Sequence, residues 1–78
     1  MDTRQQLGSR ILRRGMRGPD VAELQRRLQS LGYNVGPIDG IFGRQTERAV
    51  RQFQRDNNLV PDGVVGPRTI AVLEQLIP

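Results

Sequence analysis

The residues best suited to chemistry in this chain are two aspartates in matching surroundings, Asp39 and Asp62. Each precedes a glycine and lies seven residues before a threonine, Thr46 or Thr69. Two carboxylates brought together can act as acid and base in glycoside hydrolysis. Acid and base need different environments to separate their pKa values, however, and these two contexts are nearly identical. We therefore expect both carboxylates to bond backbone N–H groups in turns, with Asp39 also meeting the Thr46 hydroxyl and Asp62 that of Thr69.

The composition removes most other catalytic and metal-binding arrangements. The chain has no histidine and no cysteine, which excludes Ser-His and Cys-His nucleophile pairs and zinc sites built from these ligands. Calcium is an alternative, because carboxylates and backbone oxygens suit hard cations, but an EF-hand loop needs more acidic ligands than this chain offers. We expect no catalytic residue, no metal and no cofactor.

The surroundings of the two aspartates form a repeat with an offset of 23 residues, covering residues 39–46 and 62–69. Each copy reads as Asp-Gly, two apolar residues, a second glycine and then the start of a helix. The glycine after each aspartate should adopt a positive φ, which costs glycine little. The residues to which we assign a structural role in the turns are Gly40, Gly43, Asp62, Gly63, Gly66 and Thr69.

The elements that position these turns are three short helices, which predicts an all-α three-helix bundle built around a duplicated turn-helix unit. The expected helices run from Pro19 to a stop at Gly32 and from about Arg44 to Asn57, and a third begins at Pro67 and buries Ile70, Leu73 and Ile77. The segment from Tyr33 to Phe42 should be an ordered loop. The expected core consists of Ile11, Leu12, Val21, Leu24, Leu28, Leu31, Ile41, Ala49, Val50, Phe53, Leu59, Val64, Ile70 and Leu73.

The length of 78 residues suits one small domain. Residues 1–10 lack periodicity and are expected to be a flexible leader, with the domain at 11–78. No apolar region typical of a secretory signal, and no apolar run long enough to span a bilayer, is visible.

The formal net charge is +4, and every basic residue is an arginine. Arg44, Arg48, Arg51 and Arg55 should form a narrow stripe on the second helix, opposite its apolar face. Such a stripe is typical of a solvated helix face, and Glu47 should pair with Arg51. Binding of an anionic wall polymer or of nucleic acid are the alternatives.

The order and spacing of several elements resemble a known family over roughly Ile11 to Leu76. They are Leu12 to Gly15, Gly18, Asp20-Val21, Leu24-Gln25, Leu28, Leu31-Gly32-Tyr33, Gly36 to Gly43, Thr46, Ala49-Val50, Phe53-Gln54 and Asp62 to Thr69. Together they resemble the three-helix bacterial peptidoglycan-binding domain that is attached to cell wall hydrolases and amidases. One departure is Leu59-Val60-Pro61, where many relatives place proline before the apolar residue; this should alter only the turn.

The resemblance implies a non-catalytic module that binds peptidoglycan and holds a fused hydrolase or amidase against the wall. It also implies an extracytoplasmic, cell wall-associated setting. We expect a monomer that neither binds nucleic acid nor inserts into a membrane. The same fold is similar to the amino-terminal domain of matrix metalloproteinases, so a protein-interaction or pro-domain-like role is the alternative.

The ligand is expected in a shallow groove between the Tyr33–Gly43 loop and the start of the second helix. Free N–H groups and the helix dipole favour a carboxylate there, such as that of a stem peptide. An aromatic ring in the groove would pack on sugar C–H groups, although Tyr33 could instead cover a helix end and Phe42 could be core. The expected ligand-binding residues are Tyr33, Asp39, Phe42, Arg44, Gln45 and Thr46.

Overall fold

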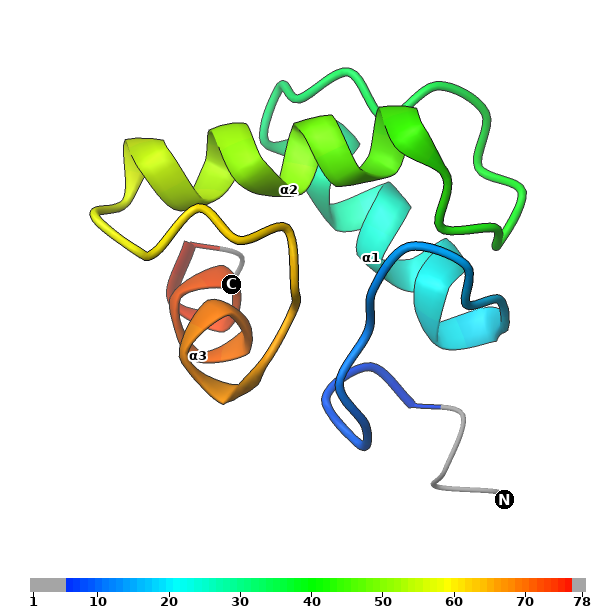
Figure 1. Cartoon of the computed structure of the whole chain (residues 1–78), viewed down its shortest axis with the longest axis horizontal. Helices are drawn as coiled ribbons and strands as arrows, with labels where there is room; N and C mark the ends of the chain where they lie inside the picture. The colour runs from blue at the N-terminus through cyan, green and yellow to red at the C-terminus, as the bar shows by residue number, and fades with distance from the viewer. Residues whose placement is uncertain (1–5, 77–78) are drawn as a thin grey trace.

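The computed structural model describes residues 6–76, and the expected three helices are present. They are α1 (Pro19–Ser30), α2 (Arg44–Asp56) and α3 (Pro67–Leu76). Figure 1 shows α2 running along the long axis of the molecule, with α1 and α3 beneath its opposite ends. Within residues 6–76 no strand forms, and none of the helices there is long and apolar enough to cross a membrane.

The three helices begin in the same way. A glycine without a capping side chain precedes each one, and its carbonyl accepts the first helical hydrogen bond. The N–H groups of Ala22, Glu47 and Ile70 donate to Gly18, Gly43 and Gly66 at 3.2, 3.0 and 3.0 Å. Proline at the first position of α1 and α3 adds a fixed φ and lacks an N–H group that would have no helical partner there.

The core lies between the helices and the extended segments that connect them. As expected, α2 buries Thr46, Ala49, Val50 and Phe53 on one face. The complete set of buried apolar residues is Leu12, Val21, Leu24, Leu28, Val35, Phe42, Ala49, Val50, Phe53, Val65 and Leu73. Leu31, Leu59 and Ile70 pack against this set while remaining partly exposed. Ile77 lies outside the described residues.

Two predicted core residues are on the surface. Ile11 is 55% exposed and Ile41 is 47% exposed, whereas their neighbours Leu12 and Phe42 are almost fully buried. The reason is that these segments are extended, so that successive side chains point in opposite directions. The second repeat shows the same alternation: Val65 is buried, whereas Val64, which was predicted to be in the core, is half-buried. Val35, which was not expected in the core, is also buried.

The segment before α1 ties both repeats together. Leu12 and Val65 exchange two backbone hydrogen bonds of 3.1 and 2.8 Å. Phe42 donates to the carbonyl of Met16 and accepts from the N–H of Gly15, both at 2.9 Å. The buried member of each apolar pair is therefore held in place through its backbone.

The start of the described chain is anchored by an ion pair. The guanidinium of Arg10 donates to both carboxylate oxygens of Asp20 at 2.8 and 3.1 Å. It also donates to the carbonyl of Arg17 at 2.8 Å. The hydrogen bond to Asp20 raises the pKa of Arg10, against the opposing effect of desolvation. Because the side chain of Asp20 is fully buried, this contact supplies the partner that a buried charge requires. Leu7 also packs against the core, and residues 1–5 of the expected leader lie outside the described residues.

Candidate functional site

A buried glutamine of α1 organises the first repeat. The side-chain amide of Gln25 donates to Asp39 Oδ1 at 3.2 Å, to the carbonyl of Ile41 at 3.0 Å and to the Thr46 hydroxyl at 3.0 Å. Its oxygen accepts the N–H of Gly40 at 2.9 Å. One side chain therefore joins the aspartate, the turn and the first turn of α2.

A buried glutamine of α2 repeats this arrangement in the second copy. Gln54 donates to Asp62 Oδ1 at 3.2 Å, to the carbonyl of Val64 at 2.9 Å and to the Thr69 hydroxyl at 3.1 Å. Its oxygen accepts the N–H of Gly63 at 3.0 Å. Each helix thus supplies the glutamine that fixes the start of the next helix, α1 for α2 and α2 for α3.

The prediction of a direct contact between each aspartate and its threonine was wrong. Asp39 and Thr46 are joined through Gln25, and Asp62 and Thr69 through Gln54, because each amide group lies between the two oxygens. The glutamines were missed as functional positions, although each directly follows a large apolar residue, in Leu24-Gln25 and Phe53-Gln54.

The turns themselves have the expected form. Asp39 accepts the N–H of Ile41 at 3.0 Å, and Asp62 accepts that of Val64 at 2.9 Å. The glycines after the aspartates have positive φ values of +73° and +75°. The backbone N–H of Ile41 and then the side chain of Gln25 hold the pKa of Asp39 below its ordinary value, because both donate to the charged form.

A groove of about 180 Å³ opens where the first repeat meets α2. We call it the Asp39 groove; it is lined by Gln25, Val35, Pro37, Asp39, Ile41, Gly43, Arg44, Gln45 and Thr46. Four of the expected ligand-binding residues therefore meet here. The side-chain amide of Gln45 donates a 3.0 Å hydrogen bond to Asn34 Oδ1, which orients it. The same side-chain oxygen of Asn34 accepts the N–H of Gly36 at 3.2 Å.

The two aromatic residues expected in the groove lie elsewhere. Phe42 is 1% exposed and belongs to the core, because its side chain points inward from the extended segment. Tyr33 donates its hydroxyl to Asp56 Oδ2 at 2.7 Å, and its ring meets that of Phe53 edge-on at 5.8 Å. Asp56 ends α2 whereas the groove opens at its first residue, about 18 Å away along the helix. Tyr33 therefore lies at the C-terminal end of α2, away from the groove.

The second repeat forms an equivalent hollow at the start of α3, with a volume of about 300 Å³. We call it the Asp62 groove; it is lined by Asn58, Leu59, Val60, Asp62, Val64, Gly66, Pro67, Arg68 and Thr69. Pro67 stands where the first repeat has Arg44, so this groove lacks both a cation and an N–H donor at that position. Val60, which is 72% exposed, adds apolar surface.

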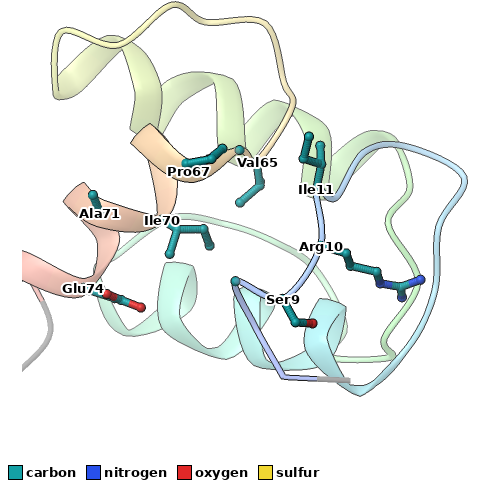
Figure 2. Close-up of a pocket in the computed structure, with 10 residues that line it drawn as sticks. Ser9, Arg10, Ile11, Val65, Pro67, Ile70, Ala71 and Glu74 are labelled. Carbon is teal, nitrogen blue, oxygen red and sulfur yellow. The ribbon is translucent and has the colours of Figure 1, made fainter. Parts of the chain in front are cut away.

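A further hollow of about 400 Å³ lies between residues 8–11 and α3. Figure 2 shows Ile70 directed into it, with Ile11, Val65 and Pro67 above and Glu74 at one side, while Arg10 extends away. Arg10 is engaged with Asp20, which leaves a mainly apolar lining with few polar groups to orient a ligand. In residues 6–76, no three acidic, histidine or cysteine side chains gather as a metal site.

Comparisons with known proteins identify the family. Residues 17–73 match the family described as "Putative peptidoglycan binding domain". An N-acetylmuramoyl-L-alanine amidase, CwlM of Mycobacterium tuberculosis, is 50% identical over 72% of this chain and 14% of the amidase. A spore cortex-lytic enzyme of Halalkalibacterium halodurans is 45% identical over 83% of this chain and 20% of the enzyme. The chain thus spans a fifth or less of these two relatives.

A solved structure agrees with this result. The crystal structure of the SleB N-terminal domain superposes with a TM-score of 0.86 and 38% identity, covering 91% of this chain and 97% of that domain. Of the two curated relatives described above, one is named an N-acetylmuramoyl-L-alanine amidase and the other a spore cortex-lytic enzyme. The chain therefore belongs to the peptidoglycan-binding domain family and is a binding module of the kind found in cell wall hydrolases.

Proposed function

We propose that this module binds peptidoglycan through the Asp39 groove, without altering it, and holds a linked hydrolase or amidase domain at the wall. The observation that carries the proposal is that α2 opens into the Asp39 groove without a side-chain cap. Gly43 cannot cap the first N–H groups of the helix, and these groups and the helix dipole attract an anion. A carboxylate of a peptidoglycan stem peptide has the matching chemistry.

The side chains around this helix start provide complementary groups. Arg44 is exposed at the first helical position and supplies a positive charge that suits a carboxylate. Asp39 is exposed, also lines the groove and can accept hydrogen bonds from peptide N–H or sugar hydroxyl groups. Gln45, held by Asn34, can both donate and accept. The groove therefore suits a ligand that combines a carboxylate with amide groups.

A non-catalytic role follows from the use of the two aspartates. In each, Oδ1 accepts both the N–H group that forms the turn and an amide N–H of the glutamine, so both aspartates have the same structural task, and Oδ2 of Asp39 is left for a ligand. Weak binding by one shallow groove still retains a linked enzyme, because tethering raises its effective concentration at the wall. The setting for such a monomeric module is extracytoplasmic, where peptidoglycan lies.

Sedimentation with purified sacculi tests this function. The protein should co-sediment, and retention should persist at moderate salt because the groove provides more than charge. The Arg44→Gln variant should bind several-fold less, while Arg68→Gln, at the start of α3, should bind like the parent. Heat-denatured protein controls for adsorption. Loss of all retention at moderate salt, or equal loss in both variants, would contradict the proposal and leave a protein-interaction role.

A further inference from the structure

The outer face of α2 carries four arginines in one line, Arg44, Arg48, Arg51 and Arg55, which we call the arginine stripe. At about 100° per residue they fall within a sector of about 60°, and they extend over about 16 Å. Arg44, Arg48 and Arg55 are exposed and Arg51 is half-buried. The stripe is therefore a basic ridge whose exposed members are Arg44, Arg48 and Arg55, while Arg51 also donates to the carbonyl of Pro61 at 2.9 Å.

Among the residues that the structure describes, most of this positive charge has no acidic partner. Glu47 lies 4.0 Å from Arg51, as the sequence predicted, but it also faces Arg14 at 3.8 Å. Within residues 6–76, no ion pair or side-chain hydrogen bond involves Arg44, Arg48 or Arg55. The arginines of α1 differ, since Arg26 and Arg27 both pair with Glu23.

The stripe is also locally unfavourable for the helix. Arg44 with Arg48, and Arg51 with Arg55, are like-charge pairs at i,i+4, which destabilise a helix. Arg44 additionally lies at the positive end of the helix dipole. Arg55 in the last turn is favourable for the dipole, so the conflict lies at Arg44 and in the like-charge pairs. Such a local conflict is more readily explained by a ligand than by stability.

We propose that the arginine stripe binds a linear polyanion whose monomer units are each joined by one phosphodiester, which is the chemistry of the glycerol phosphate chains of bacterial walls. Arginine suits phosphate because its planar guanidinium donates two parallel hydrogen bonds. A single row of cations matches a single flexible chain. Single-stranded nucleic acid is disfavoured because its binding sites use exposed aromatic rings, and Tyr33 is engaged with Asp56 and Phe53. This second contact with the wall adjoins the Asp39 groove and shares Arg44 with it, whereas Arg48, Arg51 and Arg55 are not among the residues that line the groove.

The test measures binding of a labelled glycerol phosphate oligomer by fluorescence polarisation. The double variant Arg48→Gln/Arg55→Gln leaves Arg44 and the groove intact, and glutamine matches arginine in helix propensity. The matched control is Arg13→Gln/Arg17→Gln, whose exposed side chains also have no ion pair within residues 6–76. Both variants lower the net charge of +4 by two.

We expect the stripe variant to bind on the order of tenfold more weakly at about 0.1 M salt. The slope of the logarithm of its binding constant against the logarithm of the salt concentration should be smaller in magnitude by about 1.4, because each lost phosphate contact contributes about 0.7. The control variant should bind the oligomer like the parent. Both variants should still bind to sacculi from which the phosphate polymers have been removed. Equal weakening in the two variants, or no weakening in either, would overturn the proposal. So would equally tight, equally stripe-dependent binding of single-stranded DNA, which would make the stripe a nucleic-acid site.

Discussion

Gln25 and Gln54 make the same four hydrogen bonds in the two halves of the molecule. Each amide contacts an aspartate, a carbonyl two residues later and a threonine hydroxyl, and each oxygen accepts the N–H of the glycine after the aspartate. Both side chains are 1% exposed. The duplicated unit is therefore a helix that carries a glutamine, a turn and the start of the next helix.

Replacing either glutamine by glutamate should strongly destabilise the fold. The Gln25→Glu carboxylate would face the three groups that now accept from the amide, namely Asp39, the carbonyl of Ile41 and the Thr46 hydroxyl, which leaves buried acceptors without a donor. We expect a loss of about 3 kcal/mol or more in the free energy of unfolding at neutral pH, measured by urea denaturation.

The control is Gln29→Glu, one turn further along α1, whose exposed side chain should tolerate the change. Gln54→Glu should behave like Gln25→Glu, because its contacts are equivalent. Denaturation of Gln25→Glu at the same urea concentration as the parent would refute a structural role for this network.

The sequence predicted the helices and turns well because their signals are local. Gly18-Pro19 and Pro67 mark two helix starts, and the spacing of Ala49, Val50 and Phe53 defines the buried face of α2. The repeat of Asp39 in Asp62 was visible for the same reason. The position of the Asp39 groove followed from these elements.

The glutamine network was hidden because its members are separated differently in the two copies. Gln25 precedes Asp39 by 14 residues, whereas Gln54 precedes Asp62 by only 8. Only packing of each helix against the following turn brings the pairs together. The errors at Ile11 and Ile41 have another origin, since apolar character does not say which residue of an extended pair points inward.

The glycines after the aspartates should resist substitution. Gly40 has a φ of +73°, and a Cβ there would lie 3.1 Å from the carbonyl oxygen of Gly18. We expect Gly40→Ala to lower the free energy of unfolding by about 1–3 kcal/mol, because an L side chain is strained in this conformation and backbone blocks relaxation. Gly66→Ala meets no atom within 4 Å and should cost less. A smaller loss at Gly40 than at Gly66, by thermal or urea denaturation, would contradict this account.

Tyr33 should titrate at unusually high pH. Partial burial, followed by its hydrogen bond to Asp56 and the charge of that carboxylate, raises its pKa from 10.0 to about 12. Because the folded state favours the neutral phenol, this contribution to stability is complete below pH 10 and is lost as pH rises through about 12.

Absorbance of the phenolate measures this value directly, since Tyr33 is the one tyrosine and the chain has no tryptophan. Asp56→Asn should lower the midpoint towards 10 without reaching it, because burial remains. A midpoint near 10 in the folded parent protein would show that the contact with Asp56 does not form.

Asp39 should contribute to stability in the opposite pH range. Hydrogen bonds from Ile41 and Gln25 lower its pKa below the ordinary value of 3.8, so its contribution is present above that value and disappears as pH falls through the folded pKa. We expect Asp39→Asn, which keeps an acceptor oxygen, to reduce the loss of stability on acidification. Free energies of unfolding at a series of acidic pH values, compared with the parent, provide the measurement; identical pH dependence would refute it.

Recognition of peptidoglycan at the start of α2 is tested most directly by titrating isotope-labelled protein with a purified muropeptide and following the backbone amide resonances. The proposal predicts that resonances of Arg44, Gln45 and Thr46 move in proportion to ligand added, while those of Arg68 and Thr69 stay in place. The same muropeptide with its carboxylates amidated should bind more weakly. Unchanged resonances at Arg44 to Thr46, or movement confined to the start of α3, would contradict binding in the Asp39 groove.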